Sequence, residues 1–191
     1  GATKPLLLTT DTNIGALFRS TERSLLILGA PGSGKTITLL ELAKDLLDEA
    51  DRDPRKPIPV VLNLASWAEK RPERLEDWLS ERLDRDYGVS RKAGTRWIAD
   101  GELMFLLDGL DEVVETHREA CVTAINAFWK RTQALGENGI VVCSRIDEYE
   151  TLGTRLKVQH SVQLQPVTLE QAQQYLASLG KAWDGLRQAV Q

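Results

Sequence analysis

Eight residues in the first quarter of the chain, Gly29 to Thr36, have the spacing of a phosphate-binding loop. They read Gly-Ala-Pro-Gly-Ser-Gly-Lys-Thr and fit the P-loop (Walker A) pattern G-x-x-x-x-G-K-[ST] without a mismatch. Glycines let successive backbone N–H groups point at a phosphate, and a helix beginning near Gly34 aims its positive end there. Lys35 can reach the β- and γ-phosphates, and the Thr36 hydroxyl can bind Mg²⁺. We therefore predict nucleotide contacts from Gly29, Ala30, Pro31, Gly32, Ser33, Gly34, Lys35, Thr36 and Ile37.

A second group of chemical residues follows an apolar run further along the chain. The run 103–107 leads directly into Asp108-Gly109-Leu110-Asp111-Glu112. An apolar strand that ends in Asp is the Walker B pattern, and ligands of open α/β sheets bind at the carboxyl ends of the strands. Mg²⁺ needs only one or two carboxylates. We expect Asp108 and Thr36 to form the metal site.

Hydrolysis of a nucleotide needs a group that orients water and accepts its proton. Gly109 follows Asp108, so no glutamate is adjacent to the first carboxylate. We favour Asp111 as the base and Glu112 as a supporting residue, although Glu112 could equally be a solvent-facing acid at the start of a helix. Arg145 comes after Val141-Val142-Cys143-Ser144, a strand that ends in polar residues. It is predicted to sense the γ-phosphate, with an ordinary surface arginine as the alternative.

Apolar runs and helical patterns alternate along the chain, which is typical of an α/β fold with a parallel sheet. The runs are apolar on both faces, so helices should cover both sides of the sheet. Strands are expected at 25–28, 59–64, 103–108, 140–144 and 161–164. Helices are expected at 35–50, 75–87, 91–99, 116–134 and 169–179. Strand and helix on either side of the glycine loop argue against a simple glycine turn.

The bulk composition fits one well-packed domain with a small appendage. The chain has 191 residues with 24 basic and 28 acidic side chains, a net charge of −4 that disfavours a dedicated nucleic-acid surface. We divide it into an N-terminal segment (1–23), a core (24–165) and a truncated helical subdomain (166–191). Two cysteines are expected as free buried thiols in a reducing cytoplasm. No apolar stretch reaches the ~18 residues of a membrane span, and no secretion signal is recognised.

Five segments resemble the NACHT NTPase domain of the STAND class of signal-transduction ATPases, with bacterial members the most similar. They are GAPGSGKT, PVVLNLASW, LMFLLDGLDEV, VVCSR with DEYE after it, and LQPVTLEQAQQYL. The resemblance implies a three-layer P-loop NTPase with a five-stranded parallel sheet of order 5-1-4-3-2. It also implies that Lys35 and Thr36 hold phosphates and Mg²⁺, that Asp108 binds the metal, that Asp111 orients water and that Arg145 is a sensor.

In that family ADP holds a closed monomer, and exchange for ATP permits oligomerisation, often in innate immunity and other defence signalling. We expect this sequence to lack the winged-helix region that usually closes over ADP. We therefore expect this piece to be monomeric and to bind nucleotide more weakly, whereas the full-length protein self-associates when ATP is bound.

The expected function is Mg²⁺-dependent binding and slow hydrolysis of ATP, as the regulatory switch of a larger signalling protein in the cytoplasm. No direct contact with nucleic acid or membrane is expected. One alternative is a nucleotide-binding scaffold in which ADP is structural and hydrolysis negligible. A second, less favoured alternative is a P-loop kinase that phosphorylates a small molecule. The residues leave ATP and GTP both open as the nucleotide.

Overall fold

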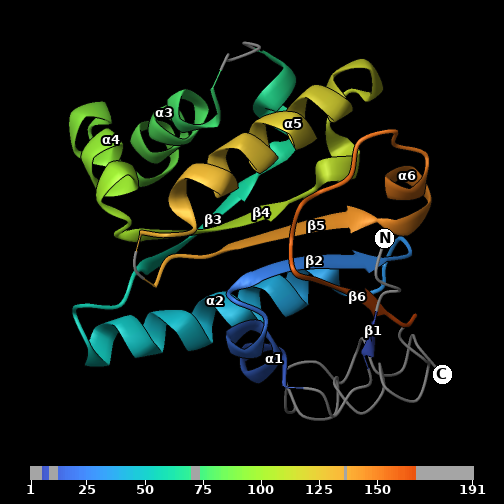
Figure 1. Cartoon of the computed structure of the whole chain (residues 1–191), viewed down its shortest axis with the longest axis horizontal. Coiled ribbons are helices and arrows are strands. Elements are labelled where there is room, and N and C mark those ends of the chain that lie inside the picture. The colour runs from blue at the N-terminus through green and yellow to red at the C-terminus, as the bar shows by residue number, and fades with distance from the viewer. Residues whose placement is uncertain (1–5, 9–12, 70–73, 136, 167–191) are drawn as a thin grey trace, which may run out of the picture.

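A parallel six-stranded sheet forms the centre of the molecule in a computed structural model of the chain (Figure 1). The structure describes residues 6–8, 13–69, 74–135 and 137–166. The strands lie in the order β1-β6-β2-β5-β4-β3, and every neighbouring pair is parallel. Their bounds are β1 Leu6–Leu8, β2 Ser24–Gly29, β3 Ile58–Asn63, β4 Leu103–Asp108, β5 Ile140–Arg145 and β6 His160–Leu164.

The five strands predicted from the sequence all occur, and their order β6-β2-β5-β4-β3 is the predicted order 5-1-4-3-2. The structure adds β1, which pairs with the outer side of β6 and which the sequence analysis did not predict. The register pairs Gly29 with Arg145 and Asn63 with Asp108. The last residues of β2, β5, β3 and β4 therefore meet at one edge of the sheet.

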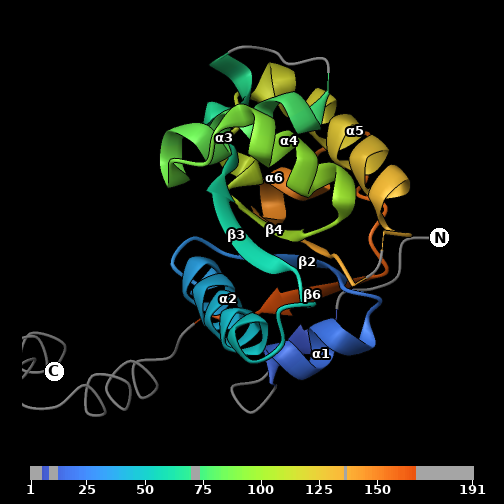
Figure 2. The same ribbon diagram turned by 90° about the vertical axis from the view of Figure 1, so that its left-hand side faces the viewer.

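Helices cover both faces of the sheet and give the molecule three layers (Figures 1 and 2). One face carries α1 (Ile14–Ser20) and α2 (Lys35–Arg52). The other face carries α3 (Leu75–Tyr87), α4 (Arg91–Asp100), α5 (Glu115–Thr132) and α6 (Ile146–Glu150). Two short 3-10 helices, η1 (Leu64–Glu69) and η2 (Leu110–Glu112), follow β3 and β4.

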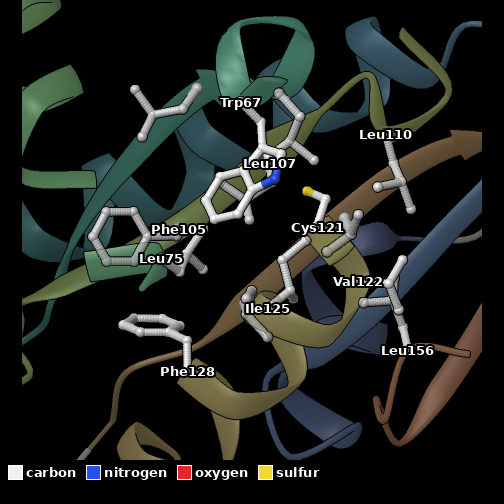
Figure 3. Close-up of a cluster of buried hydrophobic side chains, with 14 of the residues drawn as sticks. Trp67, Leu75, Phe105, Leu107, Leu110, Cys121, Val122, Ile125, Phe128 and Leu156 are labelled. Atoms are coloured by element: carbon white, nitrogen blue, oxygen red, sulfur yellow. The ribbon is translucent and has the colours of Figure 1, made fainter. Parts of the chain in front are cut away.

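Alternating side chains of the strands build two hydrophobic clusters, one on each face of the sheet. In β4, Phe105 and Leu107 belong to the cluster under α3 and α5, which we call the upper cluster, and Figure 3 shows part of it. Met104 and Leu106 belong to the lower cluster with α1 and α2. Such alternation is expected because successive strand side chains point to opposite faces.

Edge-to-face aromatic pairs tie the upper cluster together. The ring centroids of Phe105 in β4 and Phe128 in α5 lie 5.7 Å apart. Those of Trp67 in η1 and Trp78 in α3 lie 5.9 Å apart. Edge-to-face pairs add roughly 0.5–1.5 kcal/mol beyond the area that they bury. The aromatic contacts therefore help to fix α5 against the sheet and α3 against η1.

Both cysteines are free and buried, as predicted, and they lie in different clusters. Cys121 of α5 belongs to the upper cluster and Cys143 of β5 to the lower one. Among the described residues, no helix combines the length and apolar character needed to cross a membrane.

Several predicted boundaries shift, and four short helices are new. Helix α2 runs two residues further than predicted, to Arg52, whereas α5 ends earlier, at Thr132. The sequence analysis did not predict α1, α6 or the 3-10 helices, because each spans seven residues or fewer and gives little periodicity. The expected helix 169–179, and the appendage beyond Pro166, lie outside the described residues.

Candidate nucleotide-binding site

The glycine-rich loop joins β2 to α2 at the carboxyl edge of the sheet. Gly32 and Gly34 have φ angles of 73° and 88°, which L-residues rarely adopt, so the loop path requires glycine there. Gly29 is needed for another reason: a Cβ atom on it would lie 2.3 Å from the Ser33 hydroxyl oxygen. The loop closes on itself through the Ser33 N–H, which donates to the Ala30 carbonyl at 3.2 Å.

Lys35 is half-buried and folds back over the loop. Its Nζ donates to the carbonyl oxygens of Gly29 at 2.9 Å and Ala30 at 3.0 Å. The Ser33 hydroxyl is buried and has no hydrogen-bond partner within the described residues. A polar loop with an unpaired buried hydroxyl, a lysine ammonium and the start of a helix is chemically suited to a phosphate group.

Thr36 and Asp108 lie side by side, as the predicted metal site requires. The Thr36 hydroxyl donates to Asp108 Oδ2 at 2.7 Å, which joins the first turn of α2 to the tip of β4. Within the described ranges, no three His, Cys, Asp or Glu side chains gather as a complete metal cage. One hydroxyl and one carboxylate instead fit Mg²⁺, which takes its remaining ligands from phosphates and water.

Asp111 and Arg145 form a tight pair between η2 and the end of β5. The backbone N–H of Arg145 donates to Asp111 Oδ1 at 3.0 Å, and Arg145 Nε lies 2.9 Å from Asp111 Oδ2. The Asp111 side chain is only 6% exposed, whereas that of Arg145 is 44% exposed. Arg145 Nη1 also lies 3.5 Å from Glu148. Both Asp111 oxygens therefore contact Arg145, whose guanidinium remains open to solvent.

Glu112 is exposed at the same edge and is held by Asn63 from the end of β3. Asn63 Nδ2 donates to Glu112 Oε2 at 2.9 Å, while Asn63 Oδ1 accepts the Ala65 N–H at 2.7 Å. Glu112 also lies against Gly109, which has a φ of 74° and whose Cβ, if present, would be 2.9 Å from Glu112 Cδ. The carboxylate is thus fixed by an amide on one side and a glycine on the other.

Two polar residues that touch the site were missed by the sequence analysis. Asn63 gave a usable signal, because it ends a strand at the same sheet edge as Asp108. Arg118, in the first turn of α5, gave none. It is buried, and its Nη2 donates to the carbonyls of Asp111 at 2.8 Å and Val113 at 3.1 Å.

Cys143 forms part of the wall beneath the site and is chemically passive. Burial raises the pKa of this thiol well above its usual value, and the negative charges of Asp108 and Asp111 raise it further against the opposing effect of Lys35. A thiol that stays protonated is neither a nucleophile nor a metal ligand. Cys143 therefore contributes packing.

The structure brings the predicted catalytic and metal residues to one edge of the sheet, around the loop. These residues are Lys35, Thr36, Asp108, Asp111, Glu112 and Arg145. Of the predicted nucleotide contacts, Pro31 is exposed at the loop tip, and Ile37 is 51% exposed on α2.

Comparison with known proteins gives a family and a fold. The NACHT domain family matches residues 23–182. No curated protein sequence matches the chain significantly. The fold is similar to the Aeropyrum pernix ORC1 protein solved in complex with DNA, at 17% identity and a TM-score of 0.57, over 81% of this chain and 42% of that one. It is also similar to C. elegans PCH-2, at 17% identity and a TM-score of 0.52, over 86% and 41%.

The chain thus spans about two fifths of the length of each of these solved structures. The family match covers the glycine loop, the acidic motif and the strand that ends in Arg145. The chain therefore belongs to the NACHT domain family, and it is a nucleotide-binding P-loop NTPase module.

Proposed function

We propose that this domain binds ATP with Mg²⁺ and hydrolyses it slowly, as the switch of a larger signalling protein. The observation that carries the proposal is the meeting of Lys35, the Thr36–Asp108 pair and the Asp111–Arg145 pair at one edge of the sheet. ATP rather than GTP follows from the resemblance to signal-transduction ATPases.

In this proposal the glycine loop and Lys35 bind the β- and γ-phosphates. Lys35 exchanges its hydrogen bonds to the Gly29 and Ala30 carbonyls for bonds to phosphate oxygens. Thr36 and Asp108 hold Mg²⁺, which neutralises charge on the phosphates when it is bound. The exposed Arg145 guanidinium stabilises charge on the γ-phosphate.

Asp111 and Glu112 take different roles in hydrolysis. Since Asp111 directs both oxygens to Arg145, the contacts favour Asp111 as the residue that aligns Arg145, and Glu112 as the proton acceptor. This is the reverse of the roles expected from the sequence. A comparison of Asp111→Asn with Glu112→Gln distinguishes the two assignments, because only loss of the base removes the pH dependence of kcat on a carboxylate.

The direct test measures nucleotide binding and phosphate release in Lys35→Ala and Asp108→Ala. The matched control is Lys44→Ala, which removes an exposed lysine from the same helix. Lys35→Ala should lose binding and Asp108→Ala should lose Mg²⁺-dependent hydrolysis, while Lys44→Ala behaves like the unaltered chain. Phosphate release undiminished in both site variants would overturn the proposal.

The nucleotide is identified by thermal unfolding with ATP, ADP, GTP or GDP. A ligand at 100 times its dissociation constant stabilises the folded state by about 2.7 kcal/mol, which is a shift of several degrees for a domain of this size. A shift with adenine nucleotides that disappears in Lys35→Ala is expected. An equal shift with guanine nucleotides would contradict the choice of ATP.

A scaffold in which ADP is structural remains a second candidate, favoured by the glycine at 109, where a catalytic glutamate could follow Asp108 directly. Multiple-turnover phosphate release that is lost in Glu112→Gln excludes it. Self-association of the full-length protein with ATP, as in the family, is the final element of the proposal, and light scattering with ATP or ADP measures it.

A further inference from the structure

The buried guanidinium of Arg118 contacts the acidic loop, residues 109–114, although it belongs to none of the recognised motifs. Arg118 lies in the first turn of α5 and is 9% exposed. Its Nη2 donates to the carbonyl oxygens of Asp111 and Val113 at 2.8 and 3.1 Å, and its Nε is buried with no hydrogen-bond partner among the described residues.

The position is a poor one for a cation if only stability matters. The first turn of a helix is the positive end of its dipole and favours anions. A buried charge also carries a desolvation cost, and a well-packed apolar side chain of similar volume often replaces a buried charge without loss. Packing alone therefore does not account for an arginine at residue 118.

The two acceptors of Arg118 lie on either side of Glu112 in the sequence. One side chain thus holds the carbonyl of the residue before this glutamate and the carbonyl of the residue after it. It also holds the main chain of Asp111, while the Asp111 carboxylate is held by Arg145. Arg118 and Arg145 therefore fix the same residue from two directions, one through its carbonyl and the other through its carboxylate.

We propose that Arg118 is a positioning residue that holds Asp111 and Glu112 in register with Arg145 for hydrolysis. The proposal rests on the function proposed above, but its geometric part does not depend on turnover. It makes α5 part of the site: a displacement of the start of this helix would move the acidic loop and, through Asp111, the Arg145 guanidinium.

The experiment compares Arg118→Met and Arg118→Lys with Arg82→Met. Arg82 in α3 is a matched control, because its side chain is 18% exposed and it pairs with the local Asp86 at 2.6 Å. Its Nε is also buried and has no hydrogen-bond partner in the part of the chain that the structure describes. Two quantities are measured in each variant: kcat and KM for the nucleotide, and hydrogen exchange of the Arg145 amide, whose N–H donates to Asp111.

In Arg118→Met we expect kcat to fall about ten-fold with KM within about two-fold, since positioned acid–base groups contribute 10²–10⁴-fold and only their alignment is lost. The Arg145 amide should exchange about ten-fold faster through local opening of the loop. Arg118→Lys should retain part of the kcat and part of the protection of the Arg145 amide, because an ammonium can still donate to a carbonyl. Arg82→Met should change neither kcat nor the exchange of the Arg145 amide, apart from any effect on global unfolding.

A double variant tests the route. If Arg118 acts through Asp111, adding Arg118→Met to Asp111→Asn should lower kcat by less than about two-fold more than Asp111→Asn alone. The effects of residues in one network are not additive. Unchanged Arg145 exchange in Arg118→Met, or equal changes in Arg118→Met and Arg82→Met, would overturn the inference. If the unaltered domain does not hydrolyse nucleotide, the proposed function fails, while the exchange measurement still decides the geometry.

Discussion

At the residue scale, the orientation of Asn63 determines what faces Glu112. The Ala65 N–H occupies the Asn63 carbonyl oxygen, so the amide nitrogen must point to the Glu112 carboxylate. An aspartate at this position would keep the bond to Ala65 and would bring a second negative oxygen against Glu112.

We therefore predict that Asn63→Asp lowers kcat by about ten-fold, because repulsion displaces the Glu112 carboxylate, and leaves nucleotide affinity within about two-fold. Steady-state phosphate release and nucleotide titration measure the two effects. Asn126→Asp is the control, since Asn126 also holds backbone groups, those of Arg155 and Lys157, but lies away from the site. Equal kcat in Asn63→Asp and the unaltered chain would refute the prediction.

Gly109 has a second role besides its backbone conformation. Gly109→Ala should lower the free energy of unfolding by about 1–2 kcal/mol, because the φ angle of this residue is 74°. The variant should also have a lower kcat, because the new Cβ atom would push against Glu112. Gly88→Ala separates these effects, since Gly88 has a φ of 68° with open space around it. Urea unfolding should report similar losses in both variants, and only Gly109→Ala should lose activity. A loss of kcat in both would contradict this explanation.

At the element scale, the sequence predicted the strands and the glycine loop that hold most of the candidate site residues. Gly29, Asp108 and Arg145 were predictable because each ends an apolar strand, and the carboxyl ends of parallel strands meet at one edge. The pair of Asp111 with Arg145 was not, because it depends on how the short helix η2 turns after Gly109. Arg118 was not predicted either, because its contacts also depend on the conformation of η2.

The strand β1 shows another limit of the sequence pattern. It spans only Leu6–Leu8 and pairs at the edge with β6, so tertiary context rather than a local signal determines it. The long elements, by contrast, were found nearly to the residue. Helix α3 matches its predicted range of 75–87, and strand β4 matches 103–108.

An ion pair between helices makes the stability of the upper layer depend on pH. Glu76 of α3 accepts from Arg131 of α5 at 2.6 Å and from Arg74 at 3.0 Å. Burial raises the pKa of Glu76, but hydrogen bonds from its own backbone N–H and from both arginines outweigh burial, so its pKa lies below the ordinary value. The stabilisation is therefore present above the unfolded pKa of about 4.3 and is lost as the pH falls through the lower folded value.

We predict that Glu76→Gln lowers the free energy of unfolding by up to ~1 kcal/mol at pH 7 and that the difference shrinks as the pH falls below about 4. Urea titrations of both proteins between pH 3 and 7 measure it. A difference that stays constant over this range would mean that Glu76 acts through packing and not through its charge.

At the scale of the whole molecule, the two hydrophobic clusters share the strands of one sheet. We expect them to unfold together, because removing either cluster would expose one face of every central strand. Leu42 of α2 and Ile125 of α5 are fully buried representatives of the lower and upper cluster, at 0% and 1% exposure.

Leu42→Ala and Ile125→Ala should each lower the free energy of unfolding by about 2–5 kcal/mol. The two losses should add in the double variant, since the sheet separates the two side chains. The described tryptophans 67, 78, 97 and 129 all lie in or against the upper cluster, so fluorescence reports that layer, whereas circular dichroism reports all helices. Trp183→Phe in every variant removes the fifth signal. Coincident transitions are expected, and a dichroism change that precedes the fluorescence change in Leu42→Ala would contradict a single cooperative unit.

The division of the two cysteines between the layers has a consequence for how opening of this domain can be followed. Burial raises the pKa of both thiols, so an alkylating reagent reacts with either only after its side of the sheet has opened to water. Cys121 then reacts when the α3–α5 side opens, and Cys143 when the side of α1 and α2, beneath the nucleotide loop, opens. The chain therefore contains a natural chemical probe on each side of its sheet, and the labelling rate of Cys143 with and without nucleotide would measure how strongly the ligand closes its own layer.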